Sequence, residues 1–377
     1  MTLRTGITTG ACATAAAKAA ATLLCRGEGD PITHIEISLP DGALITVPVL
    51  YARREGERAI AAVRKDAGDD PDVTHGLEVQ AAVWFSQGSG VSLTGGEGVG
   101  TVTKPGLQVP PGSPAINPVP QQMIRQAVAE VTDRPLCVEI AIPGGRQIAE
   151  KTFNPRLGVV GGLSILGTTG IVRPFSNQAI RDTIRCSLDV AAACGVKAPV
   201  LVPGNIGARA ARRHFKLAEQ QVVEVSNEWG FALDVLRKRS FTTLLVVGHP
   251  GKLAKLAGGE WDTHSSRSPA AALAVGKLAA EILPAPPPAC DTVEGIFAAL
   301  PAEQAKRLGD ALAARVRAAI AERLNSAAKE EAMSEGKMPS LLAGETPVPL
   351  MDERIAVVLI NMAGDVLGSD GDLEPWR

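Results

Sequence analysis

Small residues and acids near chain turns are the groups best suited to chemistry in this sequence. The first segment, Arg4–Cys12, places three threonines and two glycines just before an Ala-rich stretch that predicts a helix over 11–24. The free N–H groups and positive dipole at a helix start favour an anion, and glycine lets it approach the backbone. The alternative is a capped helix end packed closely within the protein. Cys12 could be an activated thiolate, although a small buried hydrophobic residue is the simpler interpretation.

A second segment, Lys65–Thr74, concentrates acids. Four carboxylates fall within seven positions, at Asp66, Asp69, Asp70 and Asp72. The spacing is a poor match to a calcium loop, because the late glutamate that completes such a loop has no counterpart at the right distance. The segment is therefore either a solvated turn or a group of acids that accept hydrogen bonds from ribose hydroxyls or an ammonium group of a ligand.

Two glycine-rich segments follow. Gly95–Thr101 superficially resembles a dinucleotide fingerprint, but residues 101–106 cannot open the helix that would hold a pyrophosphate, so we expect a glycine loop or bulged hairpin. Gly161–Val172 brackets a short apolar run with glycines and carries the hydroxyls of Thr168 and Thr169. Such a segment needs positive φ or a close backbone approach. Ligand binding and a purely structural role are equally open for it.

Two turns come directly after predicted strands. Gly204–Gly207 follows the strand 199–202, and Gly248–Lys252 follows the strand 242–247. In open α/β sheets, ligands bind at the carboxyl ends of the strands. The chain has no P-loop and no G-x-S-x-G elbow, so ATP hydrolysis and esterase chemistry lose support. His249 and His264 are the best acid–base candidates, although a single loop histidine is more often structural.

Composition excludes several classes of function. The formal net charge is −2, and only twelve aromatic residues are present (Trp 4, Tyr 1, Phe 7), which argues against nucleic-acid binding. The six cysteines and five histidines show no zinc spacing, so we predict no metal site. No apolar run approaches the ~18 residues of a membrane span. We therefore expect a cytoplasmic protein with reduced thiols, no membrane or nucleic-acid partner, and a homo-oligomer as an open option.

The length of 377 residues suggests two or three domains. Residues 1–150 predict an α+β domain with a helix over 11–24 that stops at Gly27, a hairpin over 34–39 and 44–49, and a helix over 121–131. Further strands are expected at 59–63, 77–85, 90–93 and 136–142.

Residues 151–288 predict an α/β domain with a mostly parallel sheet and glycine-rich ligand loops, because strands alternate there with helices. Besides the two strands above, we expect helices over 178–194, 206–215, 227–239 and 269–282, and a turn at 248–252. Residues 289–377 predict one or two helices over 294–325, an irregular stretch over 330–349 and a final strand over 354–360, which can pack on the α/β domain.

Together these segments resemble the cobalt-precorrin-5B C(1)-methyltransferase family, CbiD. The resemblance is carried by R-T-G-I-T-T-G-A-C-A-T-A-A-A-K-A-A at 4–20, K-D-A-G-D-D-P-D-V-T-H-G at 65–76, G-E-G-V-G-T-V-T-K-P-G-L at 96–107, G-G-L-S-I-L-G-T-T-G-I-V at 161–172, and G-H-P-G-K-L-A-K-L-A-G-G from Gly248, followed by Thr263-His264-Ser265. These motifs cover about the first three-quarters of the chain in order. Nothing is carried over to the tail after Pro288.

The resemblance implies transfer of a methyl group from S-adenosylmethionine to ring carbon C-1 of cobalt-precorrin-5B, giving cobalt-precorrin-6A in anaerobic cobalamin biosynthesis. Cobalt belongs to the substrate, so no protein ligand set is required. One alternative is a non-catalytic protein that binds a tetrapyrrole intermediate. A nucleotide-dependent oxidoreductase rests on the glycine loops alone and ranks last.

No standard methyltransferase D/E-x-G-x-G loop follows an early strand, so no motif locates the cofactor. We expect the cofactor to contact small and acidic residues of the segments above, namely Thr8, Thr9, Gly10, Asp69, Asp72, Gly204, Asn205, Gly207, Gly248 and Gly251. We expect basic and hydroxyl residues to bind the acidic substrate, namely Arg4, Lys65, Lys104, Arg156, Thr168, Thr169 and Lys252. The catalytic residue is unknown, with His249 and His264 as weak candidates.

Overall fold

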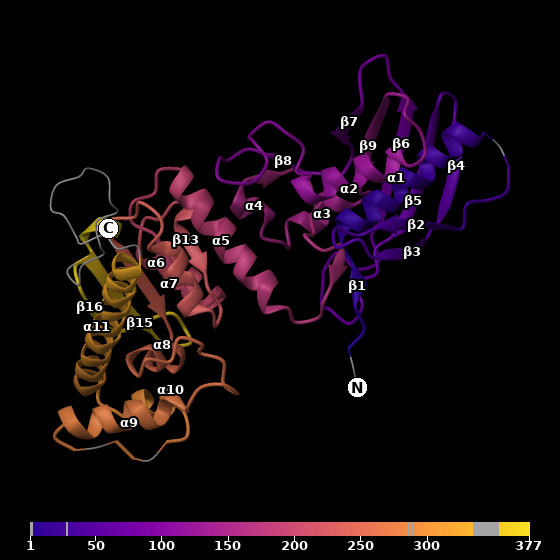
Figure 1. Cartoon of the computed structure of the whole chain (residues 1–377). Coiled ribbons are helices and arrows are strands. Elements are labelled where there is room, and N and C mark those ends of the chain that lie inside the picture. Colours follow the sequence, from indigo (N-terminus) through magenta and orange to yellow (C-terminus); the bar gives the residue numbers. More distant parts are fainter. Residues whose placement is uncertain (1–2, 28, 286, 289, 335–353) are drawn as a thin grey trace. The chain divides into compact units, whose positions relative to one another are not determined.

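The computed structural model describes residues 3–27, 29–285, 287–288, 290–334 and 354–377. The chain forms two compact units, unit 1 (Met1–Ser176) and unit 2 (Asn177–Arg377) (Figure 1). The segment 151–176 thus belongs to unit 1. The domain boundaries at 150 and 288 stay predictions about which parts of the chain fold on their own.

Unit 1 is built around helix α1 (Thr9–Arg26). Thr8 caps its start and Gly27, with φ +77°, ends it, which confirms the helix expected from these local signals. Almost the whole helix is buried, since alanines let neighbouring elements approach it from all sides. α1 packs with α2 (Pro118–Ala129) against one face of a sheet.

That sheet has the strand order β4-β5-β6-β9-β7. Its strands are β4 (Tyr51–Glu55), β5 (Arg58–Arg64), β6 (Glu78–Phe85), β9 (Leu136–Ala141) and β7 (Val91–Gly95). All neighbouring pairs are antiparallel except β7 and β9, which are parallel. The expected hairpin is confirmed as β2 (His34–Ser38) and β3 (Leu44–Pro48).

Short elements complete unit 1. Two pairs of two-residue strands were not predicted: β1 (Gly6–Ile7) with β11 (Ile171–Val172), and β8 (Thr101–Val102) with β10 (Val159–Val160). The short helices are α3 (Gly145–Ala149) and α4 (Asn154–Leu157). Of the two alternatives for Gly95–Thr101, the glycine loop agrees with the structure and the bulged hairpin is wrong, because β7 pairs with β9 and β8 with β10.

Unit 2 contains a five-stranded sheet in the order β13-β12-β14-β15-β16. Its strands are β12 (Val200–Val202), β13 (Val222–Glu224), β14 (Leu244–Gly248), β15 (Ile355–Ile360) and β16 (Val366–Asp370). The first four are parallel and β16 is antiparallel, so the mostly parallel sheet is confirmed.

Helices cover both faces of this sheet. One face carries α6 (Asn205–His214). The other face carries the apolar residues of α5 (Asn177–Ala193), α7 (Trp229–Leu236), α8 (Pro250–Ala257), α9 (Ala271–Ile282), α10 (Val293–Ala298) and α11 (Ala302–Ser334). Two short 3-10 helices span Glu219–Gln221 and Glu374–Trp376.

Some expectations for unit 2 need correction. The turn expected at 248–252 is limited to His249, because Gly248 ends β14 and Pro250 starts α8. Proline favours the first helical position. The one or two helices expected over 294–325 are confirmed as α10 and α11, but α11 continues to Ser334, so residues 330–334 are helical and not irregular. Residues 335–349 of that stretch lie outside the described residues. The strand at 354–360 is β15, and the unpredicted β16 follows it.

Among the described residues, no helix has the length and apolarity to cross a membrane.

Candidate functional site

Four of the five motifs meet in unit 1, beginning with the N-terminal segment and the acidic loop 65–75. The Ile7 N–H donates to the Asp66 carbonyl (2.7 Å), and the Asp69 N–H donates to the Arg4 carbonyl (3.0 Å). The Arg4 N–H in turn donates to the Asp69 carboxylate (2.6 Å). At Gly6 a Cβ atom would lie 2.2 Å from the Ala67 carbonyl carbon, so only glycine allows the two backbones to meet.

The segment 164–172 covers the start of α1. The N–H groups of Thr8 and Gly10 donate to the carbonyls of Gly170 (2.9 Å) and Leu166 (3.0 Å). The Thr9 hydroxyl donates to the Ser164 carbonyl (3.1 Å) and accepts from the Leu166 N–H (3.0 Å). These bonds occupy the polar groups that could have bound an anion.

The structure therefore favours a capped and packed helix start. The Thr8 hydroxyl accepts from the Ala11 N–H (3.1 Å), and Thr8, Thr9 and Gly10 are all buried. Cys12 is fully buried, and this burial raises the pKa of its thiol to about 12. Cys12 is a small core residue, and the activated thiolate is wrong because burial opposes ionisation of the thiol more strongly than the charge of Lys65 favours it.

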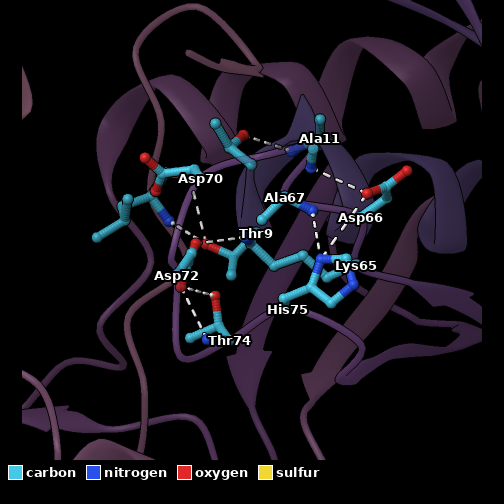
Figure 2. Close-up of polar contacts among 12 residues, drawn as sticks. Thr9, Ala11, Lys65, Asp66, Ala67, Asp70, Asp72, Thr74 and His75 are labelled. Carbon is cyan, nitrogen blue, oxygen red and sulfur yellow. Dashed lines mark hydrogen bonds and ion pairs between the residues drawn. The ribbon is translucent and has the colours of Figure 1, made fainter. Parts of the chain in front are cut away.

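Lys65 lies beneath the acidic loop rather than on its surface. Only 2% of its side chain is exposed, and its Nζ lies 2.6 Å from Asp72 Oδ2. The N–H and hydroxyl of Thr74 donate to Asp72 Oδ1 (2.8 and 2.6 Å). Figure 2 shows Lys65 and Thr74 both in contact with the Asp72 carboxylate. Partial burial opposes ionisation of Asp72, but the hydrogen bonds from Lys65 and Thr74 outweigh it and lower the pKa of Asp72.

The other acids of the loop also have partners. Arg4 pairs with Asp66, and this hydrogen bond is the main reason why the pKa of Asp66 is lowered. His75 Nδ1 lies 3.8 Å from Asp66 and accepts from the Ala67 N–H (3.1 Å) (Figure 2).

Asp70 accepts from the N–H of Phe175 (3.0 Å). Phe175 has a φ of +55°, and its side chain is 70% exposed. The acidic loop thereby holds the chain just before α5.

Sequence analysis missed Thr74 and His75. An aspartate two residues before a threonine is a signal of the local hydrogen-bonded turn found here, and it could have indicated the role of Thr74. The bonds made by His75 depend on tertiary folding and have no such local signal.

The remaining predicted residues of unit 1 are more accessible. Lys104 Nζ donates to the Arg156 carbonyl (3.2 Å), so these two predicted substrate residues lie together. Thr168 and Thr169 are exposed on the loop that covers α1. The third motif joins the fourth through a hydrogen bond from the Leu163 N–H to the Gly98 carbonyl (2.8 Å).

In unit 2 the predicted residues gather at the carboxyl edge of the sheet. From β12 the chain passes through α6 to β13 on one side, and then through α7 to β14 on the other side of β12. The carboxyl ends of β12 and β14 therefore form a topological switch point, where α/β sheets bind ligands. This is the strongest positional evidence for a ligand site in unit 2.

The glycines at this edge differ in their surroundings. A Cβ at Gly207 would lie 2.8 Å from the Val247 carbonyl, and one at Gly248 would lie 2.7 Å from the Pro203 ring, so both serve close packing. At Gly204, which precedes α6, a Cβ would have no neighbour within 4 Å among the described residues. No side chain caps α6, and its first residue Asn205 is exposed.

His249 is held at both ring nitrogens. Its Nδ1 accepts from the Gly251 N–H (3.0 Å) and caps α8, and its Nε2 lies 2.7 Å from the Glu294 carboxylate. The structure thus gives His249 a structural role at the start of α8. His264 is exposed in the loop after α8, with Nδ1 2.7 Å from the Ser266 hydroxyl.

Lys252, on the first turn of α8, is half-buried. Burial, and to a smaller extent the charge of Lys255, lowers the pKa of Lys252. A less hydrated ammonium group at the carboxyl edge of the sheet is suited to pair with an acidic group.

One hollow contains none of the predicted residues. It has a volume of about 620 Å³ and is lined by Arg54, Gly56, Glu57, Trp84 and Phe85 in unit 1. Among the described residues, no group of three or more histidines, cysteines or acids could hold a metal ion.

Known proteins resemble this chain along its length. The CbiD family model matches residues 1–174. A curated cobalt-precorrin-5B C(1)-methyltransferase of Syntrophotalea carbinolica is 53% identical over 378 residues, which cover 100% of this chain and 99% of the relative. Its namesake from Moorella thermoacetica is 48% identical over 280 residues, covering 74% of this chain and 76% of the relative.

A crystal structure of the cobalamin biosynthesis protein (cbiD) from Archaeoglobus fulgidus matches with a TM-score of 0.38 and 27% identity, covering 70% of this chain and 83% of that chain. The family assignment does not depend on this match. Since the identity to a named relative extends over the whole chain, the protein belongs to the CbiD family of cobalt-precorrin-5B C(1)-methyltransferases.

Proposed function

We propose that this chain transfers a methyl group from S-adenosylmethionine to carbon C-1 of cobalt-precorrin-5B, giving cobalt-precorrin-6A and S-adenosylhomocysteine. The observation that carries the proposal is the 53% identity over 378 residues to a relative named cobalt-precorrin-5B C(1)-methyltransferase. As a member of the family, the chain is a methyltransferase of cobalamin biosynthesis. Cobalt enters as part of the substrate.

The cofactor site is proposed at the carboxyl edge of the unit 2 sheet. S-adenosylmethionine carries a carboxylate, ribose hydroxyls and a sulfonium. The open position at Gly204 and the exposed Asn205 fit a carboxylate near the free N–H groups of α6. Gly207 lets α6 pack closely on β12 and β14, and Gly248 makes room for the Pro203 ring. Gly251 makes room for the ring of His249 at the start of α8.

The motif cluster of unit 1 is proposed to bind the acidic macrocycle. Lys104 and Arg156 lie together and suit its carboxylates, with Arg4 and the hydroxyls of Thr168 and Thr169 as further contacts. Lys252 in unit 2 remains a proposed partner for an acidic ligand.

The residues of unit 1 that we expected to bind the cofactor divide into two groups, those that hold the fold together and those that can still contact a ligand. Thr8, Thr9 and Gly10 fix the framework, because their polar groups are bonded inside the fold. The carboxylate oxygens of Asp69 and Asp72 can still accept a hydrogen bond from a ligand. Lys65 is proposed to orient Asp72 instead of touching the substrate.

Bound S-adenosylmethionine would supply an electrophilic methyl group, whose bond to sulfur breaks as the new bond to C-1 forms. The chain would contribute orientation and exclusion of water. An electron-rich ring carbon needs no strong protein nucleophile, which agrees with a site rich in glycine, threonine and acids. Neither His249 nor His264 is required to attack the substrate.

A methyl-transfer assay tests the proposal directly. Cofactor labelled in its methyl group is incubated with the chain and with either the cobalt-containing or the metal-free macrocycle. Label in the cobalt-containing product supports the proposal, and label in neither product contradicts it. Calorimetry with S-adenosylhomocysteine separates the enzyme from a non-catalytic tetrapyrrole-binding protein, which would not bind this product.

The same function leads us to infer a cytoplasmic location. Fractionation of cells that express the chain would test this location. Light scattering of the purified protein would decide whether it forms a homo-oligomer.

A further inference from the structure

An acid that sequence analysis did not single out ends the strand beside β12. Glu224 is the last residue of β13, and the parallel register places it beside Val202. Gly204 lies two residues beyond Val202 in the sequence. Glu224 is thus on the neighbouring strand, at the same carboxyl edge as the open turn before α6.

The alternation of β13 tells which face Glu224 occupies. Val222 packs in the core that contains α6, whereas Val223 packs in the core on the other face of the sheet. Side chains two residues apart on a strand share a face, so Glu224 lies on the same side as Val222 and α6. It is half-buried at that position.

The segment from β12 to Glu224 has the same order of elements as the strand–helix–strand unit that binds nucleotides in dinucleotide-binding folds. It consists of a strand, a turn with Gly204 and Gly207, a helix, and a second strand whose final acid comes twenty residues after Gly204. Val202 stands where the first glycine of a full fingerprint would be, so the sequence by itself is only a partial match. In folds of this kind, the acid after the second strand accepts hydrogen bonds from ribose hydroxyls.

The chemistry of a carboxylate fits this role. An ionised glutamate accepts hydrogen bonds and donates none, whereas ribose hydroxyls can donate. A carboxylate has two oxygens and can accept from two adjacent hydroxyls at once. By contrast, the neighbouring start of α6 supplies N–H donors that suit the opposite, anionic end of a ligand.

We propose that Glu224 accepts hydrogen bonds from the ribose hydroxyls of the methyl donor bound at this edge. This inference rests on the proposed function and adds the residue that recognises the sugar. It makes Glu224 the reason why the site prefers a ribonucleoside to a deoxyribonucleoside.

The test is calorimetric binding of S-adenosylhomocysteine and of its 2′-deoxyribose analogue to the wild type and to Glu224→Gln. The wild type should bind the deoxy analogue about ten-fold or more weakly, because a hydrogen bond to a charged group is lost. Glu224→Gln should weaken binding of S-adenosylhomocysteine by a similar factor. In this variant the two ligands should bind within about two-fold of each other, because the charged acceptor is already gone.

Two further variants serve as controls. Glu281→Gln changes an exposed acid on α9 that pairs with Arg315, and it should leave both affinities unchanged. Glu224→Asp shortens the acid while retaining its charge, and it should keep part of the preference for ribose even if Glu224→Gln unfolds. Thermal unfolding of each variant reports folding separately.

The outcomes separate the two proposals. If the wild type binds both ligands equally, or Glu224→Gln and Glu224→Asp keep the full wild-type preference, the role of Glu224 is wrong while the proposed function stands. If the wild type binds neither ligand and transfers no methyl group, the proposed function fails and the role of Glu224 fails with it.

Discussion

The starts of helices α1 and α6 follow similar sequence signals but have opposite surroundings. Both helices come after small residues that suggest an anion site. At α1, the Thr8 hydroxyl caps the helix and the residues around it are buried. At α6, Gly204 supplies no side-chain cap and has open space around it among the described residues. The comparison teaches that small residues before a helix mark either a packed joint or an open site.

The difference arises from chain segments distant in sequence. Residues 164–170 bond to the start of α1 through the carbonyls of Leu166 and Gly170. The start of α6 instead lies at a switch point of the parallel sheet, where neighbouring connections diverge to opposite faces. We call residues Thr8–Gly10 the packed joint of α1, and residues Gly204 and Asn205 the open edge of α6.

Glycine substitutions should give the largest contrast. At Gly6, next to the packed joint, an alanine Cβ would overlap the Ala67 backbone, so Gly6→Ala should lower the free energy of unfolding by about 3 kcal/mol or more. Gly204→Ala at the open edge should change it by no more than about 0.5 kcal/mol. Urea unfolding of both variants measures the difference, and equal losses would remove the distinction between the two places.

Removal of the buried ammonium should have the next largest effect. Lys65→Met leaves the partly buried Asp72 without its cation and should lower the free energy of unfolding by about 2–4 kcal/mol. Arg4→Gln breaks an exposed ion pair of the same loop, so it should lower the free energy of unfolding much less than Lys65→Met does. Denaturant titration of the two variants measures both losses of unfolding free energy. A larger loss in Arg4→Gln than in Lys65→Met would contradict the prediction.

The helix caps should differ by a smaller amount. Thr8→Ala removes the side-chain cap of α1 and should lower the free energy of unfolding by about 1 kcal/mol, whereas Thr8→Ser should keep most of it. At the open edge, Gly204→Ser adds a possible cap and should raise the free energy of unfolding by only a few tenths of a kcal/mol. Thermal and urea unfolding provide the measurement, and a stable Thr8→Ala variant would show that packing alone holds α1.

Acid should weaken the loop beside the packed joint. Because the pKa of Asp72 is lowered in the folded protein, its stabilising contribution is present above the unfolded pKa, near 4. The contribution is lost as the pH falls through the lowered folded pKa. The stability advantage of the wild type over Asp72→Asn should therefore shrink below about pH 4. Urea midpoints at several pH values test this, and a gap that widens in acid would contradict the assigned sign.

Local signals predicted the elements that they control. The end of α1 at Gly27 and the hairpin of β2 and β3 were both predicted from residues close together in the sequence. The start of α8 was missed because glycine and proline near His249 were interpreted as turn residues, although proline also starts helices. The pairs formed by two-residue strands such as β1 and β11 have no periodicity to detect.

The candidate site was predictable in its residues but not in their surroundings. The motifs identified Lys65 and Asp72, yet residue type could not tell that Lys65 is buried beneath the carboxylate. Glu224 was missed because its position depends on β13, a strand of three residues. Burial and strand order are tertiary properties, and a single sequence does not contain them explicitly.

The place of β15 in unit 2 has a consequence for biosynthesis of the protein. This strand lies between β14 and β16, although more than a hundred residues separate it from β14 in the sequence. On the ribosome, the unit 2 sheet cannot close until residues 355–360 have left the exit tunnel, while every strand of unit 1 is already available. The incomplete sheet would meanwhile expose the apolar edge of β14, and unpaired strand edges favour aggregation.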